Sequence, residues 1–158
     1  MDLKDIITAF AAENGLEGLT ADAEGAYHIG IDDMVVSFSE TGNRDEFVTW
    51  AEVAVPQQEG RERLYRALME AMFLGQGTGG ATFSLERESG EICLHRIDNS
   101  AQMDLNLFKE KLEKFVNILE QWRKLMADFA PVAHEIEEAA RNSEQETRQF
   151  GLGGFMQV

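Results

Sequence analysis

The chain has 158 residues, and its 29 acidic and 14 basic residues give a formal net charge of -15 at pH 7. This charge argues against intrinsic affinity for nucleic acids or anionic membranes, because their phosphates would be repelled, and it favours a basic or apolar partner. The length and the 44% apolar content predict a single globular domain.

The N-terminus and the single cysteine bear on the cellular compartment. The start "MDLKDIITAF" has acidic residues where a secretory signal would carry positive charge. No stretch approaches the roughly 18 apolar residues that a membrane-spanning helix needs. Cys93 is the only cysteine, so no internal disulfide can form. We expect a cytoplasmic protein.

The first 40 residues show two different periodicities. The apolar residues of 3–10 recur at helical spacing, which predicts a short helix that ends at Gly15. In "YHIGIDDMVVSF", residues 27–38, apolar and polar residues alternate on both sides of Asp32 and Asp33, which indicates a β-hairpin. The two aspartates could instead hold a metal, but the spaced ligands of a calcium loop are absent, so a turn is favoured.

The next segment predicts a third strand and a second helix. "TGNRDE" indicates another turn, and "EFVTWAEVAV" a strand that runs to Pro56. The apolar residues of "RLYRALMEAMF" cover an unusually wide arc, which predicts a helix with two buried faces. One sheet offers little cover for a second face, so we expect a symmetric homodimer through this helix. The expected interface residues are Leu64, Leu68, Met69, Met72 and Phe73.

The following segment predicts a second hairpin and no catalytic or metal site. "GQGTGG" follows a helix and enters a strand, the reverse of a phosphate-binding loop, so we interpret it as a connector. "ATFSLERESGEICLHRID" is typical of a hairpin that turns at Ser89 and Gly90. Cys93 and His95 share a strand face, but no second pair completes a metal site. No partner is recognisable for His28, and we expect no enzymatic activity and no cofactor.

Residues 105–129 give the strongest periodic signal. Apolar residues alternate spacings of three and four, which predicts a long helix that packs on the sheet; a two-stranded coiled coil is the alternative. We expect Pro131 to end or kink this helix. The chain then divides into a domain of residues 1–130 and a partly helical to flexible tail of residues 131–158.

The predicted elements follow the order α-β-β-β-α-β-β-α. Runs of strands interrupted by helices indicate the α+β class, here with a five-stranded antiparallel, twisted sheet packed by helices.

This order, with "LKDIITAFAAENGL", "YHIGIDDMVVSF", "LYRALMEAMFLG", "TFSLERESGEICLHRID" and "DLNLFKEKLEKFVNILEQWRKLM", resembles the class I type III secretion chaperones, the Tir-chaperone or CesT-like family. The resemblance covers residues 1 to about 130. Its glycine-rich "GQGTGG" departs from the shorter and more polar connector that is common in the family.

The resemblance implies a small cytoplasmic homodimer that has no catalytic activity. Such a protein holds the N-terminal segment of a secreted effector in extended form and keeps it soluble and secretion-competent. It also implies effector-binding residues along the first helix and the sheet, which we place at Leu3, Ile7, Phe10, Val36 and Phe38. The alternative is that these five residues are core.

Two further alternatives concern the function and the tail. A protein-interaction adaptor of the same fold, acting outside secretion, would bind folded partners. The apolar end "GLGGFMQV" is either a disordered end or a segment that occupies a client pocket when no client is bound.

Overall fold

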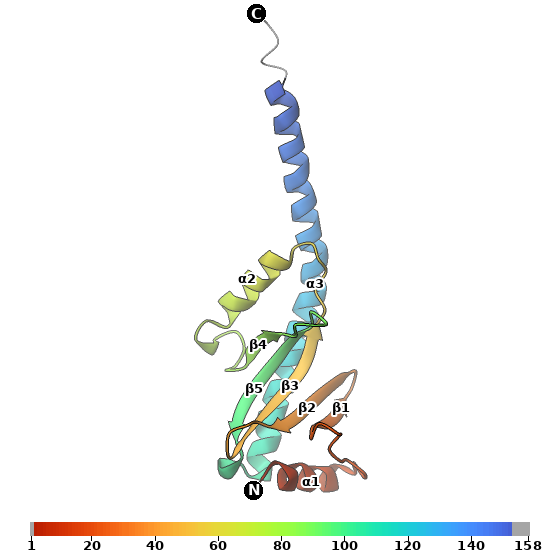
Figure 1. Cartoon of the computed structure of the whole chain (residues 1–158), viewed down its shortest axis with the longest axis vertical. Helices are drawn as coiled ribbons and strands as arrows, with labels where there is room; N and C mark the ends of the chain where they lie inside the picture. Colours follow the sequence, from red (N-terminus) through yellow and green to blue (C-terminus); the bar gives the residue numbers. More distant parts are fainter. Residues whose placement is uncertain (1, 153–158) are drawn as a thin grey trace, which may run out of the picture.

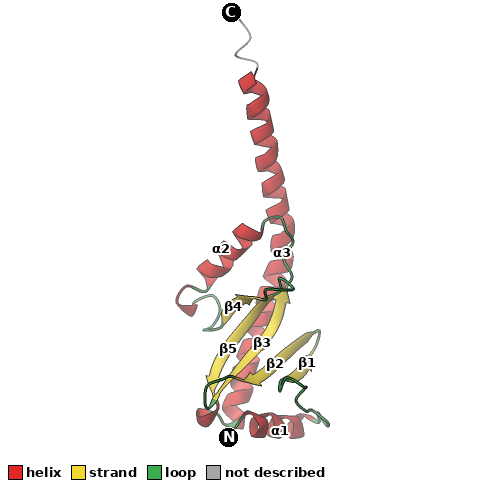
Figure 2. Cartoon of the chain, viewed as in Figure 1, coloured by secondary structure: helices red, strands yellow, loops and turns green. Residues whose placement is uncertain are grey.

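The computed structural model describes the backbone of residues 2–152 and the side chains of residues 2–128. Within residues 2–152, three α-helices and the five strands of one antiparallel sheet occur in the predicted order, so the predicted α+β class is confirmed (Figures 1 and 2). The sheet lies in front of the long third helix in Figure 1, and the first helix crosses its lower end.

Helix α1, Leu3–Asn14, begins and ends at recognisable caps. The Asp2 carboxylate accepts a hydrogen bond from the Asp5 amide at 2.8 Å, which satisfies one of the free N–H groups of the first turn. Gly15 ends the helix with a φ of 66°, a left-handed conformation in which glycine has no Cβ to clash. Leu3, Ile6 and Ile7 point into the core.

The sheet has the strand order β1-β2-β3-β5-β4, so β1 and β4 form its edges. Its strands are β1 (Tyr27–Ile31), β2 (Met34–Glu40), β3 (Glu46–Ala54), β4 (Thr82–Leu85) and β5 (Ile92–Asn99). Both predicted hairpins are confirmed. Asp32, with a φ of 53°, and Asp33 turn the chain from β1 into β2, and Gly90 lies in the turn between β4 and β5.

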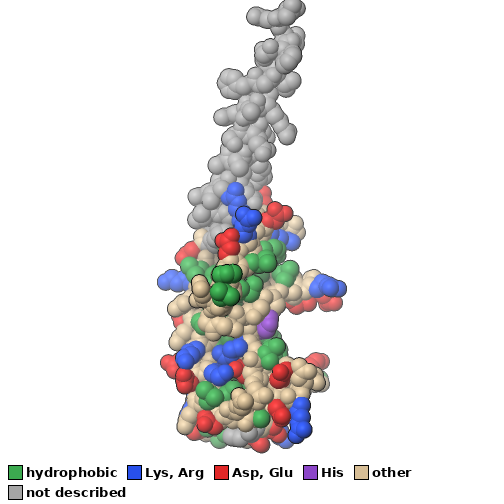
Figure 3. Space-filling view, turned by 90° about the vertical axis from the view of Figure 1, so that its left-hand side faces the viewer, with side chains coloured by type: hydrophobic (Ala, Val, Ile, Leu, Met, Phe, Trp, Pro, Cys, Tyr) green, Lys and Arg blue, Asp and Glu red, His purple; other side chains and the backbone are tan. Residues whose placement is uncertain are grey.

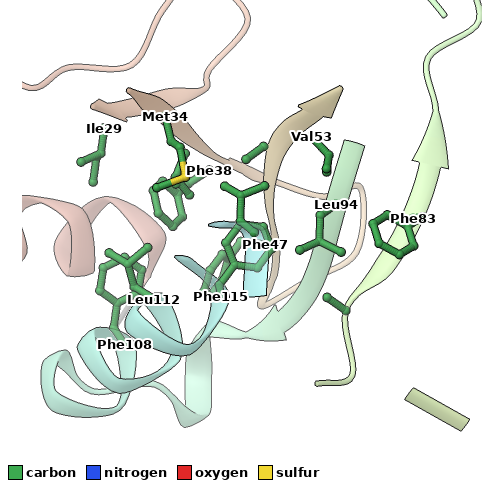
Figure 4. Close-up of a cluster of buried hydrophobic side chains, with 14 of the residues drawn as sticks. Ile29, Met34, Phe38, Phe47, Val53, Phe83, Leu94, Phe108, Leu112 and Phe115 are labelled. Atoms are coloured by element: carbon green, nitrogen blue, oxygen red, sulfur yellow. The ribbon is translucent and has the colours of Figure 1, made fainter. Parts of the chain in front are cut away.

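Helix α3, Leu105–Leu152, covers one face of the sheet and closes the core. The apolar residues of α3 that recur at spacings of three and four pack against the strands as far as Met126. The prediction that this helix packs on the sheet is therefore confirmed. Figure 4 shows these side chains interleaved with those of the strands. The core includes Val36, Phe38, Phe47, Leu94, Phe108, Leu112, Phe115 and Leu119.

We predicted that Pro131 ends or kinks the helix. The first alternative is wrong, because α3 continues through this position to Leu152; the kink stays a prediction. A proline inside a helix removes one hydrogen bond and crowds the preceding turn. Here the helix is already nucleated by the packed segment before it, and adding residues to an existing helix is easier than starting one. The sequence after the proline is also rich in Ala, Glu, Gln and Arg, which favour helices.

Helix α2, Arg61–Ala71, contacts the rest of the chain along a narrow strip. Leu68 is its only residue that is fully buried. The expected second buried face is therefore not buried within one chain. A short 3₁₀ turn, Phe73–Gly75, follows and leads into the glycine connector.

The glycine connector packs closely on both α2 and α3. The Gly77 amide donates to the Ala71 carbonyl at 2.9 Å, and its carbonyl accepts from the Trp122 indole N–H at 2.9 Å. A Cβ at position 77 would lie 2.7 Å from the Ala71 oxygen, so this approach requires glycine. The Trp122 ring also meets Phe83 edge-to-face, with centroids 5.0 Å apart.

Candidate functional site

No helix covers the face of the sheet opposite α3 in Figure 1. Apolar side chains lie on this face. Strand pairing aligns Val48 with Ile97, and Trp50 with His95, on this face. Val35 and Ile97 are each 56% exposed, whereas Val48 and Trp50 are partly buried by their neighbours. We call Val35, Val48, Trp50 and Ile97 the open-face residues. They lie on the same face of three strands.

The edge strand β1 borders this face. Because one side of an edge strand has no neighbouring strand, its backbone N–H and C=O groups on that side are available to another chain. The loop between α1 and β1 runs beside this strand and leaves a shallow groove of about 250 Å³. The groove is lined by Leu16, Glu17, Gly18, Leu19, His28, Ile29 and Gly30.

His28, for which the sequence shows no recognisable partner, joins that loop to the open face. Its Nδ1 lies 2.8 Å from the Ser37 Oγ, and its Nε2 lies 2.8 Å from the Asp22 Oδ2. The hydrogen bond from His28 holds the pKa of the Asp22 carboxyl below its ordinary value. Asp22 lies six residues before His28 in a loop, and sequence spacing alone does not reveal such a contact.

Asp22, His28 and Ser37 are the residue types of a hydrolase triad, but their arrangement is structural. Ser37 lies within β2 and is only 6% exposed, so a substrate carbonyl cannot approach its hydroxyl. The serine also faces Nδ1, whereas a nucleophilic serine is hydrogen-bonded to Nε2 in the serine-protease arrangement. The three groups therefore tie the loop to the sheet.

Cys93 and His95 lie side by side on β5, as predicted, and both are half-buried. Burial raises the pKa of the Cys93 thiol, and the carboxylates of Glu91, Glu52 and Glu86 raise it further. Burial lowers the pKa of His95, whose Nδ1 lies 3.1 Å from the Ser84 Oγ. A thiol with a raised pKa is a poor nucleophile. Among the described residues, no cluster of three His, Cys, Asp or Glu side chains is arranged to hold a metal ion.

The five residues that we predicted to bind an effector lie mostly in the core. Leu3, Ile7, Val36 and Phe38 are at most 2% exposed, and Phe10 is partly buried edge-to-face against Phe108. In this structure the first four belong to the hydrophobic core.

Sequence reasoning missed the open-face residues, although a signal was present. Strands β2, β3 and β5 have apolar residues at both alternating positions, for example Val35 beside Val36 and Trp50 beside Ala51. A strand with one solvated face has polar residues at every second position. Apolar residues at both positions therefore indicate a sheet with two contact surfaces.

The residues that we predicted at a dimer interface lie on α2 and at the start of the 3₁₀ turn that follows it. Met69 and Phe73 are 69% and 66% exposed, Leu64 and Met72 are partly buried, and Leu68 is buried. Figure 3 shows hydrophobic side chains gathered on the side of the molecule that carries α2. Leu74, which was not predicted, is 80% exposed.

The described residues include no helix with the length and apolar character of a membrane span.

Residues 5–123 match the model of the Tir chaperone protein (CesT) family. A Chlamydia pneumoniae protein designated CPj0713/CpB0740 is 29% identical over 122 residues, which are 76% of this chain and 92% of that protein.

Solved structures share the fold. A chain of the ExsC–ExsE complex has a TM-score of 0.67 at 22% identity, over 80% of this chain and 97% of that chain. A chain of the HopA1–SchA chaperone–effector complex has a TM-score of 0.62 at 14% identity, over 77% of this chain and 92% of that chain. A chain of the complex between the Yersinia pestis type III secretion chaperone SycH and a fragment of YscM2 has a TM-score of 0.56 at 21% identity. The match covers 75% of this chain and 97% of that chain. The fold and the match over residues 5–123 place this chain in the Tir chaperone (CesT) family.

Proposed function

We propose that the protein is a cytoplasmic type III secretion chaperone without enzymatic activity. It binds the N-terminal segment of a secreted effector in extended form and keeps that segment soluble and secretion-competent. The observation that carries the proposal is an uncovered apolar sheet face beside a free edge strand, in a chain of a chaperone family. The complexes named for HopA1 with SchA and for SycH with YscM2 support it by analogy.

The chemistry of the open face suits an unfolded client. An extended segment gains main-chain hydrogen bonds at an edge strand, and its alternate side chains reach apolar contacts on the neighbouring surface. Val35 and Ile97 are the most exposed contacts on this face, and Trp50 adds a large partly buried ring. The net charge of -15 keeps the complex soluble and attracts basic residues of the client.

The proposal includes a homodimer through α2. Met69 on α2 and Phe73 in the 3₁₀ turn after it are exposed apolar side chains, and α2 contacts its own chain only narrowly. A two-fold axis beside α2 would let Met69 and Phe73 of one chain pack against the same residues of a second chain. Leu64 and Met72 would lie at the margin of this interface.

The open-face contact is tested with substitutions at exposed positions, which leave the core intact. The client is first identified by co-expression with N-terminal segments of secreted proteins encoded beside this gene. In fluorescence anisotropy, Val35→Glu and Ile97→Glu should each weaken binding of the labelled segment at least about tenfold, because a buried unpaired carboxylate is costly. Leu125→Glu is the matched control, since Leu125 is 54% exposed on α3.

Unchanged affinity in both open-face variants would contradict the proposed surface. Binding of the folded effector domain, with no affinity for its N-terminal segment, would instead favour an adaptor of the same fold.

A further inference from the structure

A cavity of about 350 Å³ lies where β3 ends, α2 begins and α3 passes. Val53, Leu64 and Met126 contribute apolar walls, and Glu59, Arg61 and Arg123 contribute charged groups. Its volume is at the lower end of ligand pockets and suits one or two side chains. The open-face residues and the exposed end of α2 do not line this cavity.

Arg61 gives the cavity a hydrogen-bond donor that the chain does not use. The Nε atom of Arg61 is buried and has no hydrogen-bond partner among the described residues. A buried N–H donor without an acceptor is unfavourable, and an arginine prefers a carboxylate, whose two oxygens match its N–H groups. The position therefore favours an acceptor from another molecule.

The start of α2 also favours a negatively charged group in the cavity. Gly60 precedes the helix, and no side chain caps its first turn. The free N–H groups there and the helix dipole attract negative charge. Arg123 on α3 also lines the cavity. Its Nη2 lies 3.2 Å from the Oδ2 of Asp33 in the first hairpin. The acid group of Glu59 in the same cavity disfavours a multiply charged anion such as phosphate.

We propose that this cavity takes one acidic side chain of the client together with an apolar neighbour, and so sets the register of the bound segment. This inference rests on the proposed chaperone function. Main-chain pairing alone allows an extended segment to slip along an edge strand. On a chain of net charge -15, a client carboxylate is repelled over most of the surface and is accepted here. Val55, which is 58% exposed and lines the cavity, directly follows the central strand β3.

The cavity is tested first with two small probes on the full chain. Acetyl-Leu-Glu-Leu-amide should shift the NMR signals of the Arg61 Nε–H and of the first-turn amides of α2. Acetyl-Leu-Gln-Leu-amide, which lacks only the charge, should bind at least about tenfold more weakly. Arg61→Gln should abolish this difference, whereas Arg66→Gln, on the same helix but outside the cavity, should preserve it. Equal binding of the two probes, or equal loss in both variants, overturns the proposal.

A second measurement separates this inference from the proposed function. Arg61→Gln should bind the client segment about tenfold more weakly and should no longer distinguish it from a copy whose acidic residues are replaced by amides. If Arg61→Gln binds both copies like the unmodified chain while Val35→Glu loses binding, the cavity proposal fails and the chaperone function stands. If Arg61→Gln changes the mass of the particle in solution, the cavity serves a second copy of the chain and the proposal is also wrong.

Discussion

Asp98 is the buried charge on which the contact between β5 and α3 depends. Its carboxylate is 3% exposed and lies 2.7 Å from the Arg96 Nε and 2.5 Å from the Lys111 Nζ. Arg96 also donates to the Lys111 carbonyl at 3.1 Å and lies over the Phe115 ring. Two cations from different elements thus meet one carboxylate beside the core.

Asp98→Asn should lower the free energy of unfolding by about 3 kcal/mol, because it leaves two cations without their carboxylate in a mostly buried site. Urea unfolding measures this loss. Asp33→Asn is the control: it removes the carboxylate of an exposed ion pair with Arg123, and the expected loss is less than about 1 kcal/mol. Equal losses in the two variants would contradict the structural role of Asp98.

His95 should make stability depend on pH in the mildly acidic range. Burial lowers its pKa from 6.5, so the unfolded chain binds a proton at a pH where the folded chain does not. Stability is therefore lost as the pH falls through the unfolded value towards the lower folded value. In urea unfolding between about pH 7.5 and 5.5, His95→Gln should lose less stability than the unmodified chain. Parallel curves for the two proteins would show that His95 does not contribute.

The paired aspartates of the first hairpin have separate structural roles. Asp32 adopts the left-handed backbone that the turn needs, and Asp33 bonds Arg123 on α3. This contact fastens the tip of the hairpin to a helix 90 residues away in sequence.

At the scale of elements, α3 extends well beyond the sheet on which its first half packs (Figure 1). Among the side chains that the structure describes, to residue 128, those of α3 in the core extend as far as Met126, and the backbone remains helical to Leu152. Pro131 lies within the helix after Met126, and proline costs a helix interior about 3 kcal/mol relative to alanine.

Pro131→Ala should raise the helix content, measured by circular dichroism at 222 nm, and should delay its loss on heating. The unfolding midpoint of the packed domain should stay unchanged, because residue 131 follows the packed part of α3. Pro56→Ala, in the segment after β3, is the matched control and should not change helicity. An unaltered spectrum in Pro131→Ala would mean that the proline does not limit this helix.

At the scale of the whole molecule, α2 and the open face leave two apolar surfaces on one chain. If the first is a dimer interface, Phe73→Glu should convert the particle to the mass of a single chain of 17.7 kDa in light scattering. A charge placed in a symmetric interface faces its own copy, so both like-charge repulsion and desolvation oppose assembly. Leu125→Glu should leave the mass unchanged, and a dimer that persists in Phe73→Glu would exclude α2 as the interface.

The length of α3 also limits what the C-terminal tail can reach. Residues 153–158 lie outside the described residues. At a rise of 1.5 Å per residue, Leu152 lies roughly 40 Å beyond Met126 along the helix. Six residues span at most about 20 Å. The hypothesis that the apolar end occupies a client pocket stays a prediction. Deletion after Phe150 should raise client affinity in anisotropy measurements if it holds, and unchanged affinity would contradict it.

The sequence by itself determined the elements and their order, because helices and strands impose different periods on apolar residues that are close in the chain. The hairpin at Asp32 and Asp33, the stop at Gly15 and the sheet-packing stripe of α3 all follow from such local patterns. These patterns also carried the family resemblance, which the match over residues 5–123 confirms.

Only the tertiary structure decided which apolar residues are accessible. Val35 and Val36 have the same chemistry, and the position of α3 buries the second and leaves the first exposed. The contacts of His28, the charge cluster at Asp98 and the cavity at Arg61 join distant segments. No local period encodes them, because they depend on how the elements pack together.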